Sequence, residues 1–253
     1  MSGNFKEHSY GNNTYSRNLV LLDMKQGDVN GDGFKDNVYL YGNKHDESGT
    51  FADQITLVIQ DGRSNRISTI ALPNNSGYDA LLFLGDFSKD NISDILVSID
   101  SGGSGGYGFF YIYSFNNNIP RRLFDIEKYN KDYSFNVNYE DLYKVRVGSP
   151  SLDLLFTLDI SYKGFDYLSQ LYDENGKLKQ PVKGEVLAAA ALYPIVTNGK
   201  SISYDLLVFQ RIIGTSNSDT LGYVENLLTW NGTQFISTTL AIEIFVTKLS
   251  STY

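Results

Sequence analysis

Two short acidic segments, each followed by a run of β-forming residues, constrain the fold of this chain more than any other feature. In the first segment, oxygen-bearing side chains stand at positions 1, 3, 5 and 9, as Asp28, Asn30, Asp32 and Asp36. The arrangement returns 58 residues later, as Asp86, Ser88, Asp90 and Asp94. Strand-like residues follow each copy, at 37–41 and at 95–99. Recurrence at this distance is typical of repeated supersecondary units.

The alternating oxygens predict two calcium loops. Ca²⁺ takes about six to eight oxygen ligands, which a tight turn of this composition can supply. The expected ligands of the first loop are Asp28, Asn30, Asp32, the carbonyl of Phe34, and Asp36. Those of the second loop are Asp86, Ser88, Asp90, the carbonyl of Ile92, and Asp94. A helix-loop-helix calcium hand would need a glutamate at the twelfth loop position, where this chain has Tyr39. We therefore expect two Ca²⁺ ions, each bound before a strand.

A third, degenerate copy of the pattern lies at residues 197–205. Its corresponding positions are Thr197, Gly199, Ser201, Ser203 and Asp205, so one carboxylate is retained. Strand-like residues 206–209 follow it, as in the other copies. No strong ion site is expected here. The alternative explanation for all three segments is a set of solvated turns, because Asp, Asn and Gly are the residues that turns prefer.

The two acidic segments resemble the metal-loop core of a known repeat family. The stretches are GDVNGDGFKDNVYLYG and GDFSKDNISDILVSIDSG. Both resemble FG-GAP repeats, also called VCBS repeats, which are the units of integrin alpha propellers and of many bacterial surface proteins. The second copy departs from the family pattern with Ser88 at the third place and Asn91 where a glycine is usual. The resemblance implies a calcium-stapled β-propeller or a related sheet array, and it implies no particular reaction.

The remaining sequence favours an all-β fold. We expect a β-propeller-like array of about four blade-type repeats with few short helices, in a single domain at 18–253 that follows a flexible N-terminal arm at 1–17. A metal-free unit is expected between the second and third copies, near 135–162. The dipeptides Asp61-Gly62 and Asn231-Gly232 predict hairpin turns. Short helical turns are expected within 122–129 and 183–192.

Composition and missing motifs argue against several functions. The net charge of −8, without a basic cluster, argues against a nucleic-acid partner. Thiol chemistry and disulfides are excluded, since the chain has no cysteine. No apolar run reaches the roughly 18 residues of a membrane span. His8 and His45 lie in polar segments, and neither a GxSxG nor an HExxH motif is present.

The leading hypothesis from the sequence is a non-enzymatic, calcium-binding β-repeat protein. It would act as a binding or structural module, with an unknown protein or glycan as partner. The first residues lack a signal-peptide pattern. An extracellular, cell-surface or spore-associated location is nevertheless favoured, because extracellular calcium loops operate at roughly 10⁻⁴–10⁻³ M Ca²⁺. Two alternatives stay open: a carbohydrate-active enzyme on a propeller, which two convergent carboxylates in a cleft would favour, and an adhesin that uses its calcium to bridge a partner.

Overall fold

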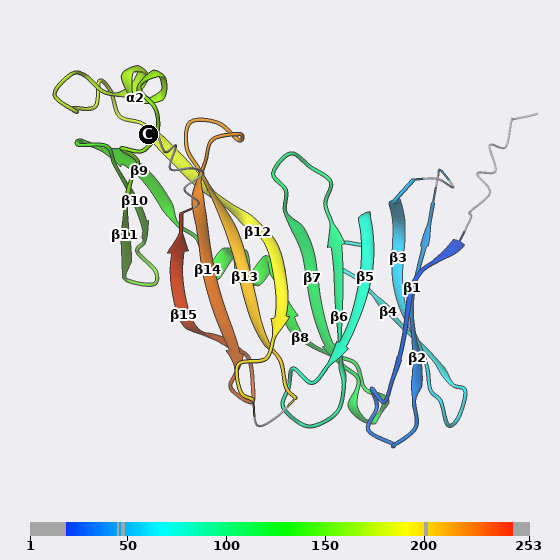
Figure 1. Ribbon diagram of the computed structural model, residues 1–253. Coiled ribbons are helices and arrows are strands. Elements are labelled where there is room, and N and C mark those ends of the chain that lie inside the picture. The colour runs from blue at the N-terminus through cyan, green and yellow to red at the C-terminus, as the bar shows by residue number, and fades with distance from the viewer. Residues whose placement is uncertain (1–18, 45, 47–48, 200–201, 245–253) are drawn as a thin grey trace, which may run out of the picture.

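The computed structural model is an all-β protein (Figure 1). It describes residues 19–44, 46, 49–199 and 202–244. The predicted arm at 1–17 therefore lies outside the described residues. The strands are β1 (Leu19–Gly27), β2 (Asp36–Asn43), β3 (Phe51–Gln60), β4 (Ile67–Ala71), β5 (Gly77–Gly85), β6 (Asp94–Asp100), β7 (Gly108–Ser114), β8 (Arg121–Asp125), β9 (Asn136–Glu140), β10 (Lys144–Ser149), β11 (Leu154–Asp159), β12 (Lys183–Ile195), β13 (Asp205–Ile213), β14 (Thr220–Trp230) and β15 (Phe235–Glu243). The helices are α1 (Ile126–Asp132), α2 (Phe165–Leu171) and one 3₁₀ turn (Asn116–Asn118).

The strands form two antiparallel sheets. In the eight-stranded sheet the order is β1-β2-β3-β5-β6-β7-β8, with β4 paired to β3. In the seven-stranded sheet the order is β11-β10-β9-β12-β13-β14-β15. The first sheet consists of two four-stranded meanders, β1–β4 and β5–β8, joined by two residue pairs between β3 and β5. Strands β12–β15 form a third meander of the same kind.

The predicted array of four separate blade-type repeats is not what the structure shows. The segment expected to form a metal-free unit of its own is instead the three strands β9, β10 and β11. Strand β9 pairs with the start of β12, through Lys183, Gly184 and Glu185. These backbone hydrogen bonds extend the third meander sideways into the seven-stranded sheet, so a fourth unit does not form. The coarser expectation, an all-β fold with few short helices, is confirmed.

Local predictions at the turns are confirmed, and one helix prediction is wrong. The Asp61-Gly62 turn lies between β3 and β4, and the Asn231-Gly232 turn lies between β14 and β15. A short helix does form near 122–129, as α1. Residues 183–192 belong to the long strand β12, in which Ala189 and Ala191 pair with Gln210 and Phe209 of β13. The side chain of Asn130 also accepts the N–H of Ala189 at 2.9 Å. Pairing with β13 overrides the helical propensity of the alanine run.

Apolar residues alternate along most strands, and their inward faces form two cores. In β2, for example, Val38 and Leu40 are fully buried while their neighbours are half-buried. The larger core joins the first sheet to α1 and to Leu206, Val208 and Leu228 of the second sheet. The smaller core lies around β9–β11 and α2. Among the described residues, no helix is long and apolar enough to cross a membrane.

A half-buried polar cluster fixes the α2 region to the second sheet. Asp219 accepts hydrogen bonds from the Lys163 ammonium at 2.8 Å and from the Tyr167 hydroxyl at 2.7 Å. The Tyr167 hydroxyl also lies 2.6 Å from that of Tyr139 on β9. Burial alone would raise the pKa of Asp219, but the bonds from Lys163 and Tyr167 lower it overall. The ionised carboxylate thus holds α2, β9 and the β13–β14 turn together.

Candidate functional site

The three sequence copies occupy equivalent places in the three meanders. Residues 28–36 join β1 to β2, residues 86–94 join β5 to β6, and residues 197–205 join β12 to β13. We call them loop I, loop II and loop III. Each connects the first strand of its meander to the second, and all three lie along the lower edge of the molecule in Figure 1. The repeat inferred from the spacing is therefore a structural repeat, including its degenerate third copy.

The acidic side chains of loops I and II make similar hydrogen bonds. At position 1, Asp28 accepts the backbone N–H groups of Gly31 and Gly33, at 2.7 and 2.9 Å. Asp86 likewise accepts two N–H groups further along loop II, at 3.1 and 3.0 Å. At position 5, Asp32 and Asp90 each accept the N–H two residues ahead, at 2.9 and 3.0 Å. The carboxylates thus satisfy the backbone of their own turns.

The last acidic residue of each loop is buried and bonds the second residue of the loop. Asp36 is fully buried and accepts the N–H of Val29 at 3.0 Å. Asp94 is 1% exposed and accepts the N–H groups of Phe87 and Ser88, at 2.9 and 2.7 Å. Burial raises the pKa of Asp94 to about 6, although the bonds from Ser88 and Phe87 act in the opposite direction. These bonds close each loop onto the start of its second strand.

The backbone of loops I and II curls in the same way. Positions 4 and 6 have positive φ in both loops: Gly31 and Gly33 in loop I, at 81° and 85°, and Lys89 and Asn91 in loop II, at 61° and 67°. Asparagine tolerates this left-handed region better than most residues, which explains why Asn91 can replace a glycine. Loop II therefore keeps the positive φ values of loop I, although Asn91 stands where the repeat pattern has a glycine.

The loops also bond one another in sequence. The N–H of Ser93, at position 8 of loop II, donates to the carbonyl of Asp28 at 3.2 Å. The N–H of Tyr204, at position 8 of loop III, donates to the carbonyl of Asp86 at 2.8 Å. Each later loop is therefore bound to the first residue of the loop before it. Asn30 of loop I extends the network, since its carbonyl accepts the N–H of Asn117 at 2.9 Å.

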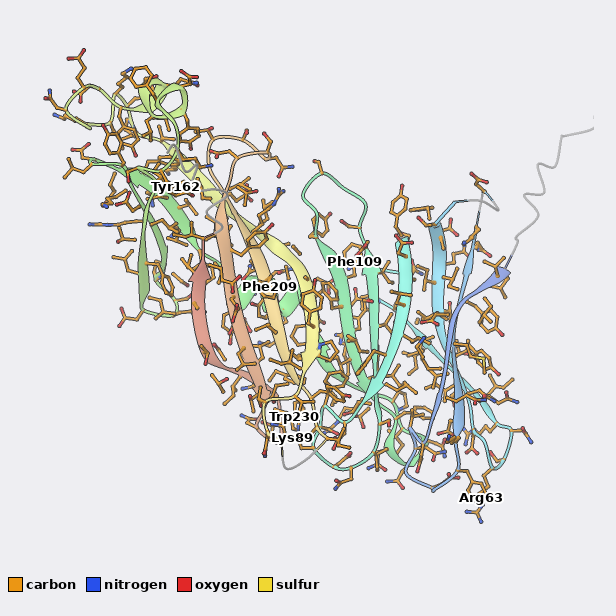
Figure 2. The ribbon with its side chains drawn as sticks, in the orientation of Figure 1. Arg63, Lys89, Phe109, Tyr162, Phe209 and Trp230 are labelled. Atoms are coloured by element: carbon orange, nitrogen blue, oxygen red, sulfur yellow. The ribbon has the colours of Figure 1, made fainter. Side chains whose placement is uncertain are left out.

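In loop III, a lysine from loop II lies beside the one retained carboxylate. The Lys89 ammonium lies 3.0 Å from Asp205, whose side chain is 5% exposed. Asp205 also accepts a hydrogen bond from the hydroxyl of Thr197. Figure 2 shows Lys89 at the lower edge, where the three loops lie. A side-chain cation thus neutralises the buried acid of the degenerate copy. Of the residues expected in this copy, Ser201 lies outside the described residues.

The calcium-binding class predicted from the sequence is not supported. Among the described residues, no group of three or more His, Cys, Asp or Glu side chains lies close enough together to hold a metal ion. The physical reason is the bonding just described: the position 1 and position 5 carboxylates turn toward backbone N–H groups, and Asp36 and Asp94 turn inward. Ca²⁺ as a cofactor, with the ligand positions given above, stays a sequence-based prediction that a measurement in solution checks.

Removing divalent cations should change the melting temperature by less than about 2 °C, which corresponds to less than about 1 kcal/mol for a chain of this size. The reason is that the loops are already closed by carboxylate to N–H bonds. The measurement is thermal unfolding in calcium, in magnesium and in excess EDTA, with metal content by mass spectrometry. Two tightly held equivalents of calcium and a large drop in EDTA would contradict this expectation and restore the ligand assignment.

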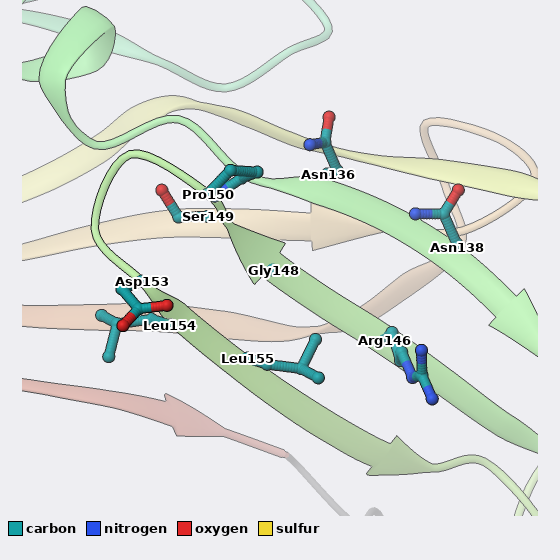
Figure 3. Close-up of a pocket in the computed structure, with 9 residues that line it drawn as sticks. All are labelled: Asn136, Asn138, Arg146, Gly148, Ser149, Pro150, Asp153, Leu154 and Leu155. Carbon is teal, nitrogen blue, oxygen red and sulfur yellow. The ribbon is translucent and has the colours of Figure 1, made fainter.

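A second candidate surface is a polar groove on β9–β11. It has a volume of about 330 Å³ and is lined by Asn136, Asn138, Arg146, Gly148, Ser149, Pro150, Asp153, Leu154 and Leu155. Asn138 pairs with Arg146 across β9 and β10, and Asn136 pairs with Gly148, so these side chains share one face (Figure 3). Gly148 leaves the centre of the groove without a side chain. The Arg146 guanidinium also forms an exposed ion pair with Glu140 at 2.8 Å.

A third surface is a hollow on β12–β15. It has a volume of about 450 Å³ and is lined by Ala190, Ala191, Tyr193, Phe209, Tyr223 and Glu243. Sequence reasoning identified neither the hollow nor the groove. Their residues alternate along strands and come together only through cross-strand register, which the sequence does not specify by itself. The one signal available was the charged residues at outward positions of otherwise apolar strands.

Comparisons with known proteins place the chain in a family. A family model described as the YybI C-terminal domain matches residues 133–243. This range includes all seven strands of the second sheet, from β9 to β15. An uncharacterized protein YybI of Bacillus subtilis (strain 168) is 40% identical over 231 residues, which are 91% of this chain and 87% of that protein. No solved structure matches.

The resemblance to FG-GAP or VCBS repeats is corrected by these matches. No FG-GAP or VCBS model matches the chain, and the similarity in the loops reflects a turn that closes with the same residue types. The resemblance is carried by two stretches of 16 and 18 residues, whereas the YybI relative aligns over 231 residues. The chain belongs to the YybI family.

Proposed function

We propose that the chain is a non-enzymatic binding module of a bacterial cell or spore surface, built on a rigid β scaffold. The observation that carries this proposal is the open polar groove on β9–β11, shown in Figure 3. Two side-chain amides and a guanidinium lie there on one face of neighbouring strands. Such groups supply directional donors and acceptors to a polar ligand, such as the hydroxyl groups of a glycan or the backbone of a protein.

The bonded loops support this role by holding the sheets in place. Binding groups act best when they stand on rigid elements, because less conformational entropy is then lost on association. The loops join the meanders of both sheets by backbone hydrogen bonds at one edge. The groove lies on strands that continue this scaffold through the pairing of β9 with β12.

A carbohydrate-active enzyme is the second candidate, because two carboxyl groups lie side by side: Glu243 lines the hollow, and Glu225 is its diagonal neighbour across β14 and β15. Their geometry argues against hydrolysis. Glycosidases keep their two carboxyl groups about 5–9.5 Å apart, so that the sugar and a water fit between them. Glu225 and Glu243 instead share a side-chain hydrogen bond. This contact supports a binding role over a hydrolytic one.

Cosedimentation with isolated Bacillus subtilis cell walls and spores tests the proposal. The intact chain is expected to cosediment, and the double variant Asn138→Ala/Arg146→Ala to bind at least about tenfold more weakly, since two directional contacts are worth about 1.4 kcal/mol or more. The matched control is Lys144→Ala, which removes a neighbouring cation of β10 that does not line the groove. Equal binding by the double variant would reject the groove, and release of soluble reducing sugars would reject a non-enzymatic role.

A further inference from the structure

The hollow on β12–β15 lies on the face of the second sheet that points away from α1. Gln210 of β13 faces α1, since its side-chain amide donates to the carbonyl of Tyr133 at 3.1 Å. Phe209 is one residue away on the same strand and therefore points to the opposite face. Figure 2 shows Phe209 on β13, in the middle of this face. The hollow is thus on the opposite face from α1 and the core beside it, and it shares no lining residue with the groove on β9–β11.

Aromatic rings form one side of the hollow. The rings of Tyr193 and Phe209 lie with their centroids 6.0 Å apart and their planes at 69°. Tyr193 is 55% exposed, so a ligand can reach this pair. Two rings at a steep angle form a corner. A corner suits a compact rounded group, whereas a sugar ring stacks flat on a single ring face.

The carboxyl group of Glu243 lines the other side, and Glu225 lies beside it on the same face. Tyr223 and Glu243 pair across β14 and β15, and Phe209 and Glu225 pair across β13 and β14. This register places both glutamates on the aromatic face. The side-chain hydrogen bond that Glu225 shares with Glu243 raises the pKa of Glu225 above its ordinary value, because it favours the protonated form; burial and the charge of Glu243 act in the same direction. Two carboxyl groups held this close repel each other when both are ionised, so a bound cation would stabilise them.

The nearest arginine of the face is directed elsewhere. Arg211 pairs with Tyr223 across β13 and β14. Its guanidinium binds the carbonyls of Ser104 and Gly105, at 3.4 and 3.3 Å, and the side chain of Asn217 at 2.6 Å. Within the part of the chain that the structure describes, no ion pair reaches Glu225 or Glu243. The negative charge of the hollow is therefore available to a ligand.

We propose that this hollow binds an organic cation of the quaternary ammonium type, with the rings of Tyr193, Phe209 and Tyr223 around its methyl groups and with Glu225 and Glu243 opposite its charge. Aromatic rings attract such cations through their negative faces, and the attraction is larger where water is partly excluded. A hollow of about 450 Å³ accommodates a small ligand of this class. This site is additional to the groove on β9–β11 and does not depend on it.

Calorimetric titration of the full chain with choline chloride tests the inference. The control ligand is 3,3-dimethylbutan-1-ol, which has the shape of choline without its charge. Saturable one-to-one binding of choline is expected, at least about tenfold tighter than that of the alcohol. The reason is that both the carboxylates and the aromatic rings attract the positive charge of choline, which the alcohol lacks. Equal affinity for the two ligands, or no saturable heat with choline, would overturn the inference. This comparison needs no variant.

Variants then assign the residues. Glu225→Gln/Glu243→Gln is expected to lower choline affinity at least about tenfold, and Phe209→Leu to lower it severalfold. The matched control is Glu174→Gln, an exposed glutamate beside the aromatic residues of α2, which should bind choline like the unaltered chain. The assignment would be rejected if the control lost choline binding. It would also be rejected if the double variant, with its fold retained by circular dichroism, bound choline as tightly as the unaltered chain. If the chain cosediments with cell walls but does not bind choline, this inference is rejected and the proposed function stands.

Discussion

Replacing Lys89 by methionine is expected to lower the free energy of unfolding by about 2–4 kcal/mol, measured by urea denaturation at pH 7. The substitution shortens the unbranched side chain by one atom and removes its charge. It leaves the Asp205 carboxylate, 5% exposed, without the cation that lies 3.0 Å away. Breaking a buried pair costs more than the pair contributes, because the remaining charge is buried without compensation. The expected loss in the free energy of unfolding is smaller than that for a fully buried pair, because the Lys89 side chain is 35% exposed.

Two further variants separate the ion pair from general damage. Lys128→Met removes the cation of an exposed pair with Asp132 and should change stability by less than about 1 kcal/mol. Adding Asp205→Asn to Lys89→Met should recover most of the loss, since no charge is then left buried. A double variant as unstable as the sum of its parts would show that Lys89 acts through packing alone.

Replacing Asp36 by alanine is expected to lower the free energy of unfolding by about 2–4 kcal/mol. The fully buried carboxylate accepts the N–H of Val29 at 3.0 Å and that of Gly62 at 2.9 Å. Both donors lose this partner in the variant. Val29 is fully buried, and an unsatisfied buried N–H costs about 1–3 kcal/mol. The bond from Gly62 is only part-buried, so its loss costs less.

The matched control for this prediction is Asp32→Ala in the same loop. Asp32 accepts the N–H of Phe34 at 2.9 Å in an exposed part of the turn, where water can replace it. A loss below about 1 kcal/mol is expected. Urea denaturation of both variants in excess EDTA removes any contribution of bound metal. Equal losses for the two variants would show that burial of Asp36 does not decide its role.

The sequence predicted the local structure of the loops well, because that structure depends on nearby residues. Positions 1, 5 and 9 bond backbone groups within a few residues, so their spacing alone identifies the turn. The degenerate copy at 197–205 was also recognisable from its spacing and from the strand that follows. What these carboxylates bind was predicted less well, since oxygens spaced for a cation are equally spaced for backbone N–H groups.

Long-range features were beyond the reach of the sequence. The contact between Lys89 and Asp205 joins residues that are distant in the chain, and Lys89 occupies a turn position where many residues would serve equally well. The alanine run in β12 predicted a helix because propensity is local, whereas its pairing with β13 is not. The convergence of Glu225 and Glu243 likewise depends on the register of β14 and β15.

The bonds between successive loops give the row of meanders a direction. Loop II donates to loop I, and loop III donates to loop II, each time from position 8 to the carbonyl of position 1. The same donor–acceptor pairing occurs at both junctions, so the two ends of the row are chemically different. Loop I contributes only an acceptor, the carbonyl of Asp28, and loop III contributes only a donor, the N–H of Tyr204. Lengthening or shortening such a protein by whole meanders would leave the internal junctions intact and would change only which unit occupies each end.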